Sequence, residues 1–416
     1  MAKRNLPCSC AVLLLPSLAF AGVHRVGPGA FSTPQAAVDA AIDGDTILIA
    51  PGNYPGFKIT DEALAIAVDP SGIVNCGAVV VESLSSAKNV LVDGLNVTAA
   101  SGMALKLHSN LGSVRIQNCT LTGASSVASN PGIVLGAGAF VTGCGDVVMR
   151  NTTILGGGGY SDWGASSGTD ALFARGSNLA LYGCTVRGGY GGWADPDSSN
   201  WGGSGGDGLE SPDSFVLAQQ TTFTGGAGGG GGDGDFLSPG GGGGAGGHGV
   251  HLRADTSGTS PEVVTRACNL SGGSGGMGGF WGGPWGVNGL PAQVSVGVVR
   301  TPVQQDLLNV TTPTRWPIGT MVPITVSGPV GSTVALLIGP DTVFVQNPST
   351  DYALHVPGPF YRRLAIGVVP ASGSIQLNVL VPSPPGGVST QAWQLQALNT
   401  GASSGPTSSL ATAVLF

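Results

Sequence analysis

The sequence predicts an all-β solenoid, from a recurring strand motif, insertions at one fixed point of the repeat, and an N-terminal segment suited to cap the first coil. The motif has mostly alternating apolar residues, followed by a polar residue or Ala and usually Gly, which is typical of a short strand at a corner. One such unit cannot bury its own apolar face, so we expect the copies to stack. They occupy residues 90–97, 114–121, 147–154, 179–186, 216–223 and 263–270.

The first 21 residues predict a secretory signal peptide. Lys3 and Arg4 precede a short apolar run, and Ala19 and Ala21 form a small-x-small cleavage site. Cleavage removes two of the 16 Lys and Arg and none of the 23 Asp and Glu, so the acidic excess rises from seven to nine. We therefore expect a secreted or cell-surface protein with no membrane span, and an acidic surface that argues against nucleic acid as a partner.

Residues 30–54 predict a cap for the first coil. Ser32 or Thr33 can N-cap a short helix that has Pro34 in its first turn and alanines on one face. Asp43 and Gly44 then turn the chain into a strand at residues 46–50. A solenoid end exposes strand edges and core, so a covering helix is expected there.

This segment resembles the pectin-lyase-like family of right-handed parallel β-helix proteins. The resemblance rests on Gln-Ala-Ala-Val-Asp-Ala-Ala at 35–41, Gly-Asp-Thr-Ile at 44–47 and Pro-Gly-Asn-Tyr at 51–54, and it extends over roughly residues 24–290. It implies a right-handed parallel β-helix at residues 22–295. It implies no single activity, because the family includes lyases, hydrolases, phage tailspikes and inactive proteins.

Three of the five cysteines beyond the leader occupy one slot of the repeat. Cys119, Cys184 and Cys268 alternate there with Leu95, Thr152 and Thr221. Thiols two coils apart would be roughly 10 Å from one another, which is too far for a disulfide. We expect them to fill the core, and the sequence leaves a bridge between Cys76 and Cys144 open.

Coil length grows along the chain because residues are inserted just after the motif, at 156–168, 188–206, 225–247 and 272–289. Insertions at a fixed repeat position must stack on one side of a solenoid. They are rich in glycine, and we expect them to be ordered by backbone hydrogen bonds, because their large aromatic side chains would otherwise be exposed to water. Five tryptophans lie in them, and we assign these as candidate sugar-binding residues: Trp163, Trp193, Trp201, Trp281 and Trp285.

After residue 295 the glycine runs end, and short β-rich stretches alternate with Pro-Gly turns. Residues 296–416 are therefore predicted to form a small immunoglobulin-like β-sandwich. Attachment, export or covering the far end of the solenoid are the roles expected for it.

Asp170, Asp207 and His248 align at the start of the strand that follows each long insertion. Two interpretations remain open. As a catalytic group, stacked carboxylates about 5 Å apart suit a retaining glycosidase or a metal-assisted lyase. As corner residues, short polar side chains bond the backbone at each turn.

Family motifs do not decide between these interpretations. Of the polygalacturonase motifs only Gly-His-Gly at 247–249 is present, and the Trp-x-Asp-His of pectate lyases is absent. Arg175 and Arg253 share one coil position and suit either a uronate contact or a solvated turn. Enzymatic activity, as a polysaccharide lyase or glycoside hydrolase, therefore stays uncertain.

Residues 202–210 fit a calcium-binding nonapeptide of β-roll proteins, but that site needs tandem copies and here there is one. Ca²⁺ remains a weak candidate, supported by acidic residues in the insertions, and no residue is assigned as a metal ligand. These acidic residues are Asp162, Asp195, Asp197, Asp233 and Asp235.

Two functions follow from these observations. The first is a secreted β-helix that binds extracellular polysaccharide on a face of stacked Gly- and Trp-rich loops, with or without cleavage. The second is a non-catalytic structural or adhesive surface protein. Tryptophans that line an open groove beside the Asp/His positions favour the first, and tryptophans packed inward among glycines favour the second.

Overall fold

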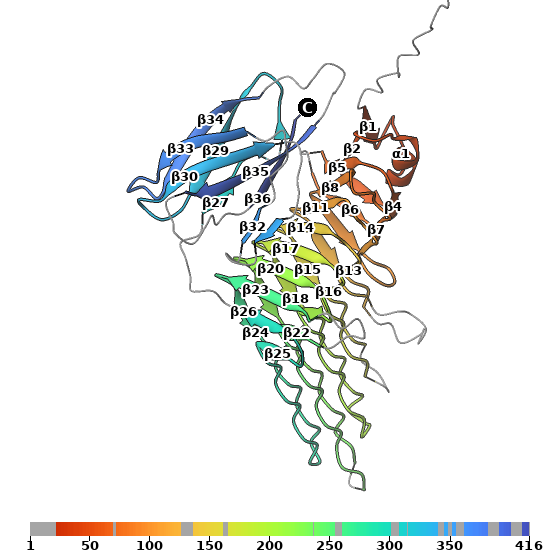
Figure 1. Cartoon of the computed structure of the whole chain (residues 1–416). Helices are drawn as coiled ribbons and strands as arrows, with labels where there is room; N and C mark the ends of the chain where they lie inside the picture. The colour runs from red at the N-terminus through yellow and green to blue at the C-terminus, as the bar shows by residue number, and fades with distance from the viewer. Residues whose placement is uncertain are drawn as a thin grey trace, which may run out of the picture.

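The computed structural model describes residues 22–69, 72–125, 136–160, 165–235, 237–253, 260–300, 308–313, 315–339, 345–347, 352–354, 362–381, 391–400 and 410–415. The predicted signal peptide lies outside these residues. Strands β1–β26 form a solenoid of three parallel sheets, and β27–β36 form a separate, mostly antiparallel unit, in which β28 and β36 pair in parallel (Figure 1). Among the described residues, no helix is long and apolar enough to cross a bilayer.

Each coil of the solenoid contributes one strand to each sheet. The first sheet contains β1 Val23–Val26, β2 Thr46–Ile49, β5 Leu64–Val68, β8 Asn89–Asp93, β11 Ser113–Gln117, β14 Asp146–Arg150, β17 Asn178–Tyr182, β20 Phe215–Gln219, β23 Glu262–Arg266 and β26 Val298–Arg300. The second contains β3 Gly52–Tyr54, β6 Val74–Cys76, β9 Leu95–Thr98, β12 Thr120–Thr122, β15 Thr153–Leu155, β18 Thr185–Arg187, β21 Thr222–Thr224 and β24 Asn269–Ser271. The third contains β4 Phe57–Thr60, β7 Val79–Glu82, β10 Leu105–His108, β13 Ala139–Thr142, β16 Leu172–Arg175, β19 Leu209–Ser211, β22 Val250–Leu252 and β25 Ala292–Val294.

The six copies of the sequence motif stack in register, which confirms the predicted all-β solenoid. Each copy supplies one strand of the first sheet and the following strand of the second sheet. Val114 pairs with Val90 on one side and with Val147 on the other, and the same register continues to Val263. The inward-facing residues of the three sheets form one continuous apolar core.

The corner between the first and second sheets lies at the fifth residue of each motif copy. The backbone there is left-handed in all six copies, for example at Gly94 (φ 85°), Asn118 (φ 53°) and Gly183 (φ 61°). Gly and Asn adopt this conformation most readily. The chain changes direction at this residue, so that the strands before and after it both face the core with their apolar side chains.

The slot after this corner holds the cysteines. Cys119 Sγ donates to the Gln117 carbonyl oxygen at 3.1 Å, and Thr152 Oγ1 donates to the Arg150 carbonyl oxygen at 2.9 Å. All five described cysteines are free thiols, so Cys76 and Cys144, whose pairing the sequence left open, are not bridged. Burial raises the pKa of the Cys119 thiol to about 12.

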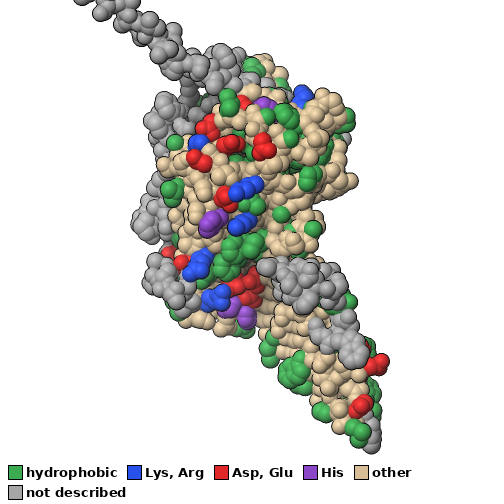
Figure 2. Space-filling model, turned by 90° about the vertical axis from the view of Figure 1, so that its right-hand side faces the viewer, with side chains coloured by type: hydrophobic (Ala, Val, Ile, Leu, Met, Phe, Trp, Pro, Cys, Tyr) green, Lys and Arg blue, Asp and Glu red, His purple; other side chains and the backbone are tan. Residues whose placement is uncertain are grey.

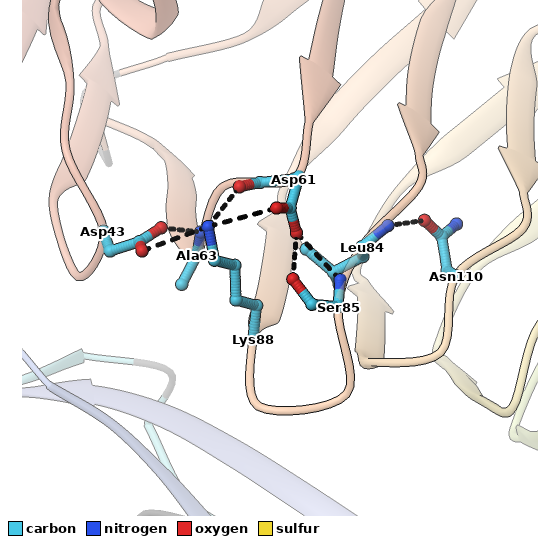
Figure 3. A network of polar contacts seen from close by, with 7 residues as sticks. All are labelled: Asp43, Asp61, Ala63, Leu84, Ser85, Lys88 and Asn110. Carbon is cyan, nitrogen blue, oxygen red and sulfur yellow. Dashed lines mark hydrogen bonds and ion pairs between the residues drawn. The ribbon is translucent and has the colours of Figure 1, made fainter.

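The N-terminal end is covered as predicted by α1 Pro34–Ala40, which packs against β1, β2 and β4. The Thr33 hydroxyl caps it by accepting from Ala36 N at 3.2 Å. Polar contacts tie the next corners together (Figure 3). Lys88 Nζ lies 3.1 Å from Asp43 Oδ2 and 3.6 Å from Asp61 Oδ2, so one lysine joins three successive coils.

The antiparallel unit is the expected small β-sandwich. One sheet has three strands, β27 Asn309–Thr311, β29 Met321–Ser327 and β34 Ser374–Leu380. The other has five, β28 Arg315–Trp316, β36 Leu410–Leu415, β35 Gln391–Asn399, β30 Thr333–Gly339 and β33 Arg362–Val368, and β31 Val345–Asn347 pairs with β32 Tyr352–Leu354.

The sandwich docks on the outer face of the first sheet (Figure 1). Tyr182 and Leu217 of the solenoid join one apolar cluster with Leu337 of β30, and Leu398 of β35 packs against it. Arg150 Nη2 donates to the Val310 carbonyl oxygen at 2.7 Å. The contact therefore lies on the flank of the solenoid, whereas one role considered from the sequence was to cover its far end.

Candidate functional site

Four glycine-rich insertions project from one side of the solenoid and form a two-layered stack, which we call the blade (Figure 1). It consists of residues 156–170, 188–207, 225–248 and 272–290, of which 161–164 and 236 lie outside the described residues. Each insertion runs outward from the second sheet and returns to the third sheet. The blade therefore has a layer of outgoing segments and a layer of returning segments.

Backbone hydrogen bonds join the segments within each layer and between the layers. Within the outgoing layer, Gly191 N donates to the Ala227 carbonyl oxygen at 2.8 Å. Between the layers, Gly206 N donates to the Gly189 carbonyl oxygen at 2.9 Å. Equivalent donors recur every third residue, which is the period of a polyproline II helix. The prediction that these loops are ordered by backbone hydrogen bonds is confirmed.

The glycines are required by the close approach of the segments. A Cβ on Gly206 would lie 2.0 Å from the Thr169 carbonyl oxygen, and one on Gly229 would lie 1.9 Å from the Gly192 carbonyl oxygen. A left-handed backbone does not explain why these positions are glycine. The described blade glycines with positive φ are Gly234 and Gly282, which lie near the outer turns of their insertions. Two glycines of each triplet are thus fixed by packing.

The third residue of each triplet points away from the blade. On the face of the outgoing layer, which we call the outgoing face, these residues are Tyr190, Trp193, Ala227, Gly230, Ser274 and Met277. On the opposite, returning face they are Trp201, Ser204, Asp207, Gly242, Ala245 and His248. A Cβ on Gly230 would meet only the ring of Trp193, at 3.0 Å, and one on Gly242 only that of Trp201, at 2.8 Å. Each tryptophan ring therefore lies over an outward glycine of the next insertion.

The outgoing face carries a groove of about 320 Å³. Tyr190 and Trp193 form one wall, Met277 belongs to the other, and Ala227 with nearby glycines forms the floor. The groove exists because the insertion at 225–248 has only Ala227 and Gly230 outward here, between Tyr190 and Trp193 of the preceding insertion and Met277 of the following one. Trp193 is 57% exposed. The groove is therefore a shallow, apolar trough with an open aromatic side.

The predicted tryptophans do not gather on one face. Trp193 lines the groove on the outgoing face, whereas Trp201 lies on the returning face, 65% exposed. Trp281 contacts the ring of Phe280 edge-on near the turn of the last insertion, at 5.8 Å between centroids. Trp285 is 74% exposed on the returning part of that insertion, and Trp163 lies outside the described residues.

Asp170, Asp207 and His248 do stack in successive insertions at the foot of the blade, on its returning side. Asp170 Oδ1 accepts from Asp207 N at 2.7 Å, and Asp207 Oδ1 accepts from His248 N at 2.6 Å. His248 Nδ1 accepts from Leu290 N at 2.9 Å. Each side chain thus bonds the backbone of the next coil, which is the geometry of the corner interpretation.

The cluster also contains Glu210 and His251, which were not predicted from the sequence, and Arg253, which the sequence offered for a uronate contact or a solvated turn. His251 Nδ1 lies 2.7 Å from Asp207 Oδ2, and Arg253 forms an ion pair with Glu210. Glu210 and His251 stand next to each other in the third sheet, three residues after Asp207 and His248. The signal in the sequence was this constant spacing of three residues, which places both side chains at an outward position of the strand that follows the insertion.

Electrostatics differ strongly within the cluster. Burial raises the pKa of the Asp170 carboxyl well above its ordinary value, and the hydrogen bond and charge of Glu210 and the charge of Asp207 raise it further. The hydrogen bond that His251 makes to the Asp207 carboxyl raises the pKa of His251. The cluster therefore favours the protonated forms of Asp170 and His251.

The outer face of the third sheet continues from this cluster toward the N-terminus (Figure 2). Charged side chains gather along it, and the blade projects from one edge. The rings of Phe140 and Phe173 stack at 4.8 Å between centroids, with 7° between their planes. The rim of this face carries Lys106, His108 and Arg175 on neighbouring strands.

No metal site emerges from the part of the chain that the structure describes, where no three His, Cys, Asp or Glu side chains are grouped to hold an ion. Residues 202–210, which match a calcium-binding nonapeptide, form part of a returning segment and β19. There Gly202 N donates to the Gly242 carbonyl oxygen at 2.9 Å. Asp162 lies outside the described residues.

Comparisons with known proteins give little beyond the fold. No protein-family model and no curated protein matches the chain. Among solved structures, it is similar to pectate lyase Pel9A, with 14% identity and a TM-score of 0.34 over 68% of this chain and 79% of that one. It is also similar to the PKD domain of an M14-like peptidase from Thermoplasmatales archaeon SCGC AB-540-F20, with 18% identity and a TM-score of 0.14 over 26% and 90%. With its three stacked parallel sheets and covering helix, the chain has the architecture of a pectin-lyase-like parallel β-helix.

Proposed function

We propose that this chain is a secreted protein that binds extracellular polysaccharide in the groove on the outgoing face of the blade. The observation that carries the proposal is the open aromatic wall of Tyr190 and Trp193 above a floor of small residues. Sugar rings present C–H faces that stack on exposed aromatic rings. Because Trp193 lies over Gly230, one face of its indole is held against the protein, while the residue as a whole stays 57% exposed.

Polar groups in the groove suit sugar hydroxyls. A helix with three residues per turn points successive N–H groups in three directions, so the N–H of an outward residue faces solvent. Among the described residues, Ala227 N donates to no protein acceptor. Arg187 lies 4.4 Å from the centre of the Tyr190 ring and adds a cation beside the groove. The groove thus combines an apolar wall with fixed donors.

Binding is tested by affinity electrophoresis on a panel of acidic and neutral polysaccharides, comparing the wild type with Trp193→Ala and Trp201→Ala. The two tryptophans are matched, since each lies over a glycine of the next insertion, but they are on opposite faces. We expect Trp193→Ala to weaken binding about tenfold, since one stacked ring contributes about 1 kcal/mol or more. Trp201→Ala should bind like the wild type. Equal losses in both variants would contradict the groove assignment.

Cleavage is a second candidate, favoured by one observation: Asp170, whose pKa is raised, lies beside the side chains of Glu210 and Asp207. Two neighbouring carboxyl groups whose pKa values differ can act as the general acid and the general base of one reaction. Product release from a retained polysaccharide, abolished by Asp170→Asn, would support it. Retention without products would leave binding alone, and a wild type that no polysaccharide retains would favour the structural or adhesive alternative.

A further inference from the structure

No described residue covers the far end of the solenoid. Leu270 and Val299 of the last coil are only partly buried, whereas their partners in the preceding coil, Phe223 and Val263, are fully buried. Within the described residues, β24, β25 and β26 each pair with a strand on one side only. Figure 1 shows them at one end of the solenoid and α1 at the other. An uncovered end of this kind exposes both core and unpaired backbone groups.

This end also carries few of the charges that normally protect a strand edge. Residues 267–299 contain no Asp, Glu, Lys or Arg, in a chain with 39 of them, and the three edge strands hold a single charged residue, Arg300 at the end of β26. Natural edges usually carry charged residues, especially Lys, that oppose pairing with another chain. Large apolar side chains are exposed here instead: Met277, Phe280, Trp281, Trp285, Val287, Leu290, Val294, Val296 and Val298.

We propose that this open end binds the same end of a second copy of the chain, forming a closed two-fold dimer. Charge favours this partner. The chain is acidic overall, so most of its surfaces would repel a second copy, but two ends whose edge strands carry one Arg each meet with little repulsion. A two-fold contact sets the strands of one end antiparallel to those of the other, with one edge strand facing its own copy and the other two facing each other's copies.

The other end of the solenoid limits the assembly to two chains. α1 covers the first coil there, and its own Ala37 and Val38 are buried against that coil. Only one open end is left, so head-to-tail stacking into a filament has no acceptor. The assembly therefore closes at the dimer.

The test is sedimentation equilibrium of the whole exported chain over a range of concentrations, with Val298→Lys and Leu290→Lys as variants. Both side chains are exposed, at 51% and 47%, so a lysine is accommodated in the monomer. Each lysine would place a new charge within the apolar contact, where it would lose its hydration. We expect a dimeric wild type and at least a tenfold larger dissociation constant for each variant. Ile73→Lys, at a 66% exposed position in an early coil, is the matched control and should remain dimeric.

Hydrogen exchange gives a second measurement on the same samples. Amides of residues 292–300 should exchange more slowly as the wild-type concentration rises, and this dependence should vanish in Val298→Lys. A wild type that stays monomeric at all concentrations, a dimer that both end variants leave intact, or growth into larger polymers would overturn the proposal. Neither measurement involves a polysaccharide, so the outcome is independent of the groove.

Discussion

At the level of single residues, the solenoid depends on small side chains that bond the backbone at its corners. Cys119 and Cys268 each donate to the carbonyl oxygen two residues earlier, as does Thr221 at the same slot. At the foot of the blade, Asp170 and Asp207 each accept a hydrogen bond from a backbone N–H of the next coil. Residue types that suggest disulfides or catalysis can therefore recur because a corner needs one buried donor or acceptor.

Asp170 provides a test with a definite pH dependence. Its folded pKa lies well above the ordinary 3.8, so the ionised carboxyl is destabilising, and this cost grows from pH 3.8 up to the raised pKa and is constant above it. Asp170→Asn keeps an acceptor for Asp207 N and offers a donor to Glu210. We expect this variant to melt at a higher temperature than the wild type at neutral pH, with a difference that shrinks as the pH falls toward 3.8. Calorimetry between pH 4 and pH 8 measures it.

Asp170→Leu separates charge from hydrogen bonding at the same position. It removes the acceptor for Asp207 N and leaves a buried N–H unpaired, which costs about 1–3 kcal/mol at every pH. A stability difference for Asp170→Asn that does not change with pH would show that the carboxyl is already ionised at little cost.

At the level of elements, the blade shows how glycine can specify structure through close packing rather than through positive φ angles. Each segment is an extended helix with a period of three residues, and at two of every three positions the neighbouring segments leave no room for a side chain. The third position is free to carry Trp, Tyr, Met or Ala. Composition at this one position therefore sets the surface of each face, while the glycines set the packing.

Gly229→Ala and Gly158→Ala test this division. A Cβ on Gly229 would lie 1.9 Å from a carbonyl oxygen, whereas on Gly158 its nearest contact would be 3.8 Å away. Overpacking costs about 1–3 kcal/mol even where side chains can adjust, and here the obstacle is backbone. We expect Gly229→Ala to make the blade sensitive to limited proteolysis and Gly158→Ala to leave it resistant. Equal resistance of the two variants would contradict the packing argument.

The sequence predicted the coils because apolar alternation and the corner residue recur in every copy, and it predicted a stack of insertions because they follow one fixed slot. It could not assign faces to Trp193 and Trp201. They are eight residues apart, but the chain reverses between them, so they lie on opposite layers. Glu210 and His251 were missed because their partners come from neighbouring coils, and the groove depends on three insertions whose outward residues alternate in size.

At the level of the whole molecule, the chain joins two units through a contact that neither reveals alone. The outer face of the first sheet is apolar at Tyr182, Leu217 and Val264, where a solvated solenoid would be polar. Burial there raises the pKa of Tyr182 far above its ordinary value. The partner residues, Leu337 and Leu398, are more than 70 positions later in the sequence, and for this reason the docking was not predictable from local patterns.

Leu337→Asp tests the docking. The substituted carboxylate would be buried against the apolar face of the first sheet without a cation, so we expect the sandwich to separate from the solenoid while both keep their own cores. Small-angle scattering should then give a larger radius of gyration, and calorimetry should resolve two transitions. Leu380→Asp is the control, since Leu380 lies on the other sheet of the sandwich and is 60% exposed.

If Leu337→Asp instead unfolds the sandwich, its near-UV spectrum will change together with the scattering. If it alters neither scattering nor melting, the apolar cluster does not hold the two units together, and Arg150 with its bond to Val310 becomes the contact to remove next.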